Sequence, residues 1–84
     1  MAIDSIPFEA TSRWSTGRRT MVLLAVDVEA DGSVSAVILE RGTGDTSVDA
    51  IAIAHARKLR WIPATAGGRP SQVRTRLVVT LRAA

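Results

Sequence analysis

The sequence predicts a small α+β domain in which one helix packs on one face of a three-stranded antiparallel sheet. Two runs of β-branched and aliphatic residues, 20–28 and 34–41, come first and are separated by an Asp-Gly pair. A stretch with apolar residues at helical spacing follows between residues 46 and 60, and an alternating run, 72–82, comes last. The predicted element order is therefore strand, strand, helix, strand.

The first two strands are predicted to form a hairpin around Asp31-Gly32. A tight turn needs a residue with positive φ, and glycine adopts that conformation without steric cost. The run 20–28 should therefore turn back directly into the run 34–41.

The helix is predicted from one apolar stripe, which is formed by Val48, Ile51, Ala52, His55, Ala56 and Leu59. Thr46 or Ser47 is expected to cap its first turn. Basic residues favour the last turn, and the helix should end near Arg60, before Pro63. We expect four residues to be buried between helix and sheet: Val48, Ile51, Leu59 and Trp61.

A right-handed crossover through the helix places the last strand beside the first. The predicted strand order is then 34–41, 20–28, 72–82, and the last strand forms an edge of the sheet. Alternation directs one set of residues toward the helix. This set consists of Val22, Leu24, Val26, Val28, Val37, Leu39, Leu77 and Val79.

The opposite face of the sheet is more apolar than a solvated face should be. Its residues are Met21, Leu23, Ala25, Ile38 and Val78, with Arg74 and Arg76 at one side. Two explanations stay open. Ordinary burial favours a cover formed by apolar residues of the N-terminal segment, 1–19. The other explanation is a dimer contact.

Composition limits the classes of function. A chain of 84 residues forms one domain with a modest core, and 46% hydrophobic with 23% charged residues is typical of a folded protein. There is no cysteine, so thiol chemistry is excluded. The longest apolar stretch, Met21 to Val28, is much shorter than the ~20 residues of a membrane helix, so we expect no direct membrane insertion by this segment.

No constellation of residues indicates catalysis, a cofactor or a metal. The only histidine, His55, has no carboxylate at helical contact distance, so we interpret it as a half-buried structural residue. Asp27, Glu29 and Asp31 alternate like the start of a calcium loop, but Gly32 follows immediately and strand residues come next. We therefore predict that the chain is not an enzyme.

Nucleic-acid binding is a weaker alternative. Several arginines could follow a phosphate backbone, namely Arg18, Arg19, Arg74, Arg76 and Arg82. Recognition of single strands on a sheet also needs aromatic residues on the strands, and the predicted strands have none. With a net charge of only +3, we expect no nucleic-acid partner beyond weak binding.

Four motifs occur in a characteristic order. The first is an alternating strand that ends in an Asp-Gly turn, MVLLAVDVEADGSV, and the second is a glycine-bearing loop leading into an alanine-rich helix, GTGDTSVDAIAIAHA. The third is a helix exit with large apolar residues around a basic one, residues 59–64, and the fourth is Gly68-Arg69-Pro70 before the last strand. From Thr20 to Leu81 the chain resembles the C-terminal domain of TonB-type energy transducers.

The resemblance implies a fold and a function for residues 20–84, preceded by the segment 1–19. The domain would be the periplasmic part of an inner-membrane-anchored protein. Its partner would be the N-terminal peptide of a TonB-dependent outer-membrane transporter, which adds a strand to an exposed sheet edge. The receiving strand would be formed by Gln72, Val73, Arg74, Thr75, Arg76, Leu77, Val78 and Val79. The alternative within protein-binding functions is a stand-alone dimerisation or scaffold domain, with a second copy of the chain as partner.

Overall fold

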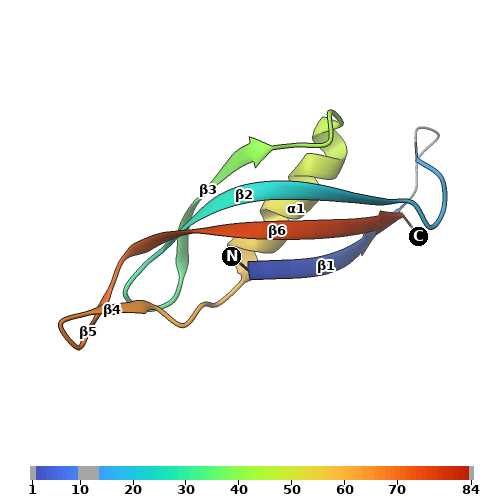
Figure 1. The fold of residues 1–84 in the computed structure, drawn as a ribbon. Coiled ribbons are helices and arrows are strands. Elements are labelled where there is room, and N and C mark those ends of the chain that lie inside the picture. The colour runs from blue at the N-terminus through green and yellow to red at the C-terminus, as the bar shows by residue number, and fades with distance from the viewer. Residues whose placement is uncertain (1, 10–13, 84) are drawn as a thin grey trace.

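The computed structural model describes residues 2–9 and 14–83, and Figure 1 shows its fold. It contains one helix and two sheets, in keeping with the α+β class. In chain order the elements are β1 (Ala2–Phe8), β2 (Arg19–Val28), β3 (Val34–Arg41), α1 (Thr46–Lys58), β4 (Ala64–Ala66), β5 (Arg69–Ser71) and β6 (Val73–Ala83).

The main sheet has four strands in the order β1-β6-β2-β3. Its three antiparallel strands, β3, β2 and β6, are the predicted ones in the predicted order. The prediction of a purely antiparallel, three-stranded sheet is wrong, because β1 adds a fourth strand that runs parallel to β6. The last strand is therefore not an edge along its whole length.

The N-terminal segment forms a strand because its residues alternate between two environments. Asp4, Ile6 and Phe8 face the helix side, whereas the exposed residues Ile3, Ser5 and Pro7 face away from it. Proline argues against a strand assignment, since it cannot donate to a ladder. It is tolerated here because β1 lies at the edge of the sheet.

We expected the N-terminal segment to cover the outer face of the sheet, but its described residues, 2–9 and 14–19, do not do so. Phe8 and Trp14 belong to the core instead, with their rings edge-to-face at a centroid distance of 5.8 Å. The Trp14 Nε1 group donates a hydrogen bond to Asp45 Oδ2 at 3.3 Å, which ties this segment to the start of α1. Met21, on the outer face, is 65% exposed.

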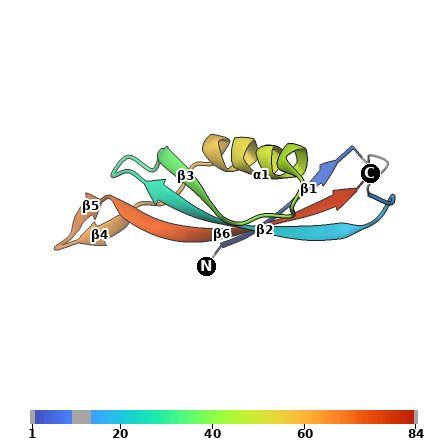
Figure 2. The ribbon, with the colours of Figure 1, turned by 90° about the horizontal axis from the view of Figure 1, so that it is seen from above.

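The segment 64–71, for which we predicted no strand, contains the short hairpin β4–β5. Gly67 and Gly68, between the two strands, both have positive φ, as a two-residue hairpin turn requires. This hairpin extends one end of a molecule about 50 Å long and 17 Å across (Figures 1 and 2).

The turn between β2 and β3 is confirmed at Gly32, where φ is +87°. The Gly32 carbonyl accepts a hydrogen bond from the Trp61 N–H group at 2.9 Å. A Cβ atom at position 32 would collide with the Trp61 carbonyl oxygen. Gly32 therefore both closes the hairpin and lets the chain that leaves the helix pass close by.

The N-cap is Asp45 rather than Thr46 or Ser47, so the helix begins one or two residues earlier than these predicted caps imply. The Asp45 carboxylate accepts hydrogen bonds from the N–H groups of Ser47 and Val48 at 2.9 and 3.4 Å. These are the free amides that a cap side chain must reach. The helix ends at Lys58, slightly before the predicted Arg60.

The helix lies along one face of the sheet, as predicted (Figure 2). Val48, Ala52 and Ala56 are buried, so small side chains form the centre of its contact. The prediction is wrong for Ile51, which is 38% exposed on the flank of the helix. Leu59 and Trp61 are half-buried and pack against the core.

The core lies between α1 and the inward residues of β2 and β6. The predicted inward residues of these two strands are all buried, namely Val22, Leu24, Val26, Val28, Leu77 and Val79. On β3, Val37 is half-buried and Leu39 is 40% exposed, because β3 lies at the edge of the sheet.

Candidate functional site

The first four residues of β6, Val73 to Arg76, have a neighbouring strand on one side only. They pair with β2, from Val28 opposite Val73 to Ala25 opposite Arg76. The ladder with β1 begins only at Leu77. Within the part of the chain that the structure describes, no strand lies along the other side of this stretch, which we call the open edge.

The direction of the backbone groups on the open edge follows from the far end of β6. The Ala83 N–H group donates to the Arg18 carbonyl, on the β2 side, at 2.8 Å. Backbone groups alternate in direction along a strand, so odd-numbered residues of β6 face β2. The N–H and C=O groups of Arg74 and the N–H group of Arg76 therefore face the open side, whereas the C=O group of Arg76 faces Ala2, where the ladder with β1 begins.

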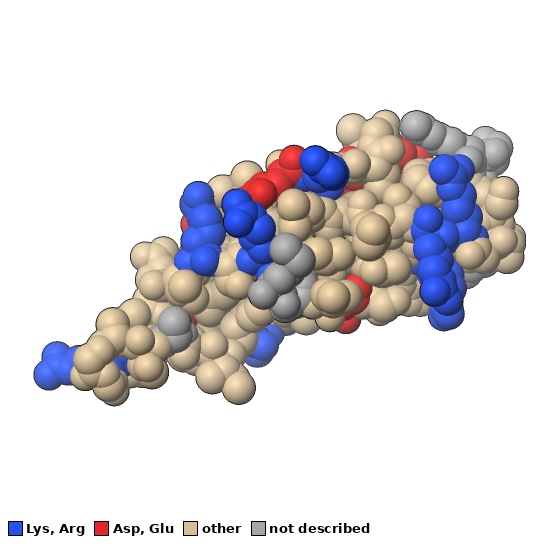
Figure 3. All heavy atoms as spheres, in the orientation of Figure 1, with Lys and Arg blue, Asp and Glu red and all other residues tan. Residues whose placement is uncertain are grey.

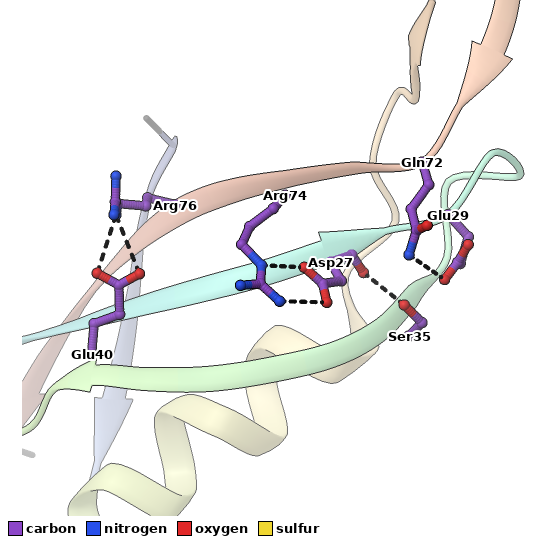
Figure 4. Close-up of polar contacts among 7 residues, drawn as sticks. All are labelled: Asp27, Glu29, Ser35, Glu40, Gln72, Arg74 and Arg76. Carbon is purple, nitrogen blue, oxygen red and sulfur yellow. Dashed lines mark hydrogen bonds and ion pairs between the residues drawn. The ribbon is translucent and has the colours of Figure 1, made fainter.

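The side chains of these two arginines lie across the outer face of the sheet (Figure 4). Arg74 donates to Asp27 with Nε at 2.7 Å and Nη2 at 3.1 Å, and Arg76 Nε lies 3.1 Å from Glu40 Oε2. The hydrogen bond from Arg74 holds the pKa of the Asp27 carboxyl below its ordinary value. The guanidinium groups thus point toward β2 and β3 rather than out from the open edge.

Beside the two ion pairs the outer face is hollowed. Glu40, Arg74, Thr75 and Arg76 line this depression, whose volume is about 470 Å³. It is open to solvent and lies next to the open edge. An extended chain bound at the edge would have room for a side chain there.

The predicted receiving strand, Gln72 to Val79, is therefore divided by the structure. Gln72 precedes β6 and donates from Nε2 to Glu29 at 3.1 Å. Val73 to Arg76 form the open edge, whereas Leu77, Val78 and Val79 already pair with β1. The sequence pattern predicted this strand, but it did not predict that half of its free side pairs with β1.

The occupied half is secured by a contact between β1 and the helix. The His55 Nε2 atom forms a short hydrogen bond with Asp4 Oδ2. This contact is the main reason that the pKa of the Asp4 carboxyl lies below its ordinary value. His55 is half-buried as predicted, but its partner comes from the N-terminal segment. The alternation of Asp4, Ile6 and Phe8 was the signal that could have revealed it.

Other arginines gather at the far end of the outer face. Arg19 and Arg82 are register partners on β2 and β6, and neither has a carboxylate partner among the described residues. The Arg18 guanidinium lies 4.4 Å from the centre of the Trp14 ring. Figure 3 shows uncharged surface between separate groups of basic residues on this face. On this face the basic residues therefore do not form a continuous track along which a phosphate backbone could bind.

The acidic residues around the hairpin have separate partners. Asp27 pairs with Arg74, Glu29 with Gln72, and Asp31 with Ser33. Among residues 2–9 and 14–83, no group of three or more His, Cys, Asp or Glu side chains is placed to hold a metal ion. The same residues include no helix with the length and apolar character needed to cross a membrane.

The chain is thus a small α+β domain with a mixed sheet and a half-open strand edge. Comparisons with protein-family models, with curated proteins and with solved structures found no match to it.

Proposed function

We propose that the chain is a protein-binding module that receives an extended peptide beside β6. The observation that carries this proposal is the open edge, where both backbone groups of Arg74 and the N–H group of Arg76 have no neighbouring strand among the described residues. Unpaired N–H and C=O groups on a strand are a template for another chain, and many peptide-binding domains use them in this way.

The open edge differs from the guarded edges of many sheets. Native proteins often protect an edge with proline, a bulge or inward-pointing charges. Residues 73–76 include no proline, and their register with β2 is regular. Their two charged side chains are bound to Asp27 and Glu40 across the outer face. A peptide can therefore approach the backbone without displacing a protecting group.

The sequence motifs favour a particular class of partner. Because the chain resembles the C-terminal domain of TonB-type transducers, we propose the N-terminal peptide of a TonB-dependent outer-membrane transporter as the ligand. The domain would then act in the periplasm as the coupling end of an inner-membrane-anchored protein.

A titration followed by NMR tests this function. Amide shifts of the ¹⁵N-labelled chain are recorded while a synthetic transporter-derived peptide is added. We expect the largest changes at Arg74 and Arg76 and their neighbours in β6. A peptide of the same composition with proline at alternate positions is the control. Changes confined to α1 or to the turn around Gly32, with β6 silent, would contradict the proposal.

Self-association through the outer face is the second candidate function. Met21, Ile38 and Ile3 are 65%, 42% and 76% exposed, and all three lie on this face. The residues that β2 contributes to the outer face include Arg19 at one end, Leu23 in the middle and Asp27 at the other end. Two copies packed face to face with antiparallel strands would place Arg19 of each over Asp27 of the other and bring the two Leu23 side chains together.

Sedimentation velocity distinguishes this candidate from peptide binding. A dimer that forms by this packing should dissociate in the Leu23→Asp variant, because a charge would be buried at the centre of the contact. A wild-type chain that stays monomeric at high micromolar concentration would exclude the candidate and leave the peptide proposal untouched.

A further inference from the structure

The open edge and the ladder with β1 are two parts of one continuous strand edge. β1 pairs with β6 from Ala2 opposite Leu77 to Phe8 opposite Ala83. The open edge, Val73 to Arg76, continues the same side of β6 in the other direction. In Figure 1 β1 begins beside the middle of β6, and β6 runs on past it toward the β4–β5 hairpin. A ligand strand that entered at the open edge and continued along β6 would meet β1.

β1 has the features of a bound peptide rather than of a core strand. Its outward residues are exposed, with Ile3 at 76%. A parallel pair is also slightly less stable per residue than an antiparallel one. Its attachment to the rest of the domain therefore depends on its inward residues.

Three inward residues at alternate positions hold β1. Asp4 bonds to His55 on the helix, Ile6 packs against the core, and Phe8 is buried against Trp14. The rest of the sheet supplies the matching features. They are the His55 imidazole on the helix, the core beside Leu81, and the Trp14 ring.

We propose that β1 is an intramolecular occupant of the peptide-binding edge, and that the partner replaces it with a segment of the same pattern. This inference rests on the proposed strand addition. The partner segment runs parallel to β6 and carries an acidic, an aliphatic and an aromatic residue at alternate positions. In the register of β1, residues three or more positions before its acidic one lie along the open edge.

The arrangement accounts for an edge that is only half free. The partner first pairs with Arg74 and Arg76, where no strand has to be displaced, and then exchanges with β1 residue by residue. An attached competitor acts at an effective concentration in the millimolar range. The apparent affinity of the partner is reduced by the fraction of molecules in which β1 is released. A substitution that weakens the attachment of β1 should therefore raise the apparent affinity of the partner.

A reversible disulfide tests whether β1 must leave. Ser5 and Thr80 are register partners whose side chains face outward, and the chain has no cysteine of its own. Neighbouring strands lie about 4.8 Å apart, within the Cα separation that a disulfide spans. The full chain with Ser5→Cys and Thr80→Cys is measured oxidised and reduced. The probe is a fluorescein-labelled peptide AIDSIPFE, the sequence of residues 2–9.

We expect the reduced protein to bind the probe and the oxidised protein to lose measurable binding. The matched control carries Met21→Cys and Thr80→Cys, which join β2 to β6 across register partners and leave β1 free. It should bind the probe equally in both redox states. Equal binding by the locked and unlocked Ser5–Thr80 protein would overturn the inference. Shifts at Arg74 and Arg76 with the transporter peptide would leave the proposed function intact in that case.

A second variant does not depend on forming a disulfide. Asp4→Asn in the full chain removes the ionised partner of His55 and leaves His55 available for the probe. Probe affinity should rise about threefold, the effect expected for losing a half-exposed hydrogen bond. A probe with its own aspartate changed to asparagine should bind this variant about threefold more weakly than the original probe. No binding of the probe to any unlocked protein, or no change with either substitution, would overturn the inference.

Discussion

Arg74 on β6 and Asp27 on β2 are register partners, and the guanidinium group of Arg74 donates to both carboxylate oxygens of Asp27. This pair directs the arginine away from the open edge and across the sheet. It leaves the backbone of Arg74 exposed on the side where the proposed ligand would pair.

The first prediction concerns the ionisation of Asp27. Its depressed pKa means that the ion pair stabilises the fold fully above the ordinary carboxyl pKa of about 3.9 and is lost as the pH falls through the folded-state value. Arg74→Ala should return the pKa of Asp27 toward its ordinary value, which a carboxyl ¹³C titration measures. The pKa of Asp31, whose hydrogen bonds come mainly from Ser33, should stay unchanged and serves as the control.

The second prediction compares two proline substitutions in β6. The N–H group of Arg74 faces the open side, so Arg74→Pro should keep the fold and abolish peptide binding. The N–H group of Thr75 faces β2, so Thr75→Pro should cost about 1 to 3 kcal/mol of unfolding free energy. Urea unfolding and peptide titration measure the two effects. Arg74→Ala, which keeps the N–H group, is the control for the side chain. Normal binding by Arg74→Pro would refute the assigned backbone direction.

The third prediction concerns acid release of β1. The pKa of Asp4 is depressed by its bond to His55, so this bond stabilises the docked β1 above about pH 3.9 and is lost as the pH falls through the folded-state value. Amide protection in β1 should therefore decline on acidification before that of β2. In Asp4→Asn the protection of β1 should be lower at neutral pH and should lack this acid-dependent step. The same step in both proteins would show that another group controls β1.

The fourth prediction concerns the buried carboxylate of the helix, Asp49, which is only 6% exposed. Its Oδ1 atom accepts hydrogen bonds from the Thr43 N–H group at 2.8 Å and the Thr43 hydroxyl at 2.9 Å. Asp49→Ala leaves the Thr43 N–H group without its partner and should lower the free energy of unfolding by about 1 to 3 kcal/mol. Thr43→Val removes only the hydroxyl donor and should cost about 0.5 to 1.5 kcal/mol. Urea unfolding should rank the two variants in this order, and the reverse order would contradict the assigned role of the carboxylate.

The fifth prediction compares the loss of stability caused by truncating a side chain at the centre of the core with that caused by truncating one at its flank. Leu24 is fully buried, so Leu24→Ala should cost about 2 to 5 kcal/mol. Ile51 is 38% exposed, so Ile51→Ala should cost about 1 kcal/mol or less. Thermal or urea unfolding measures both. Equal losses would mean that the helix packs through a different stripe.

Local sequence patterns were sufficient to predict the three antiparallel strands, the turn at Gly32 and the position of the helix. These features depend on interactions between residues close in the chain, such as alternation along a strand and the conformational freedom of glycine. The pattern also distinguished the two faces of β2 and β6 correctly, because a strand must direct its apolar alternate residues to one side.

The sequence by itself therefore determined an α+β domain in which a helix packs on a sheet that contains three antiparallel strands in the predicted order. Only the tertiary structure decided that half of this edge is occupied by β1, that His55 meets Asp4, and that Arg74 and Arg76 lie across the sheet. Each of these contacts joins residues between 36 and 75 positions apart in the chain. No local periodicity specifies them, since they depend on which elements the completed sheet brings side by side.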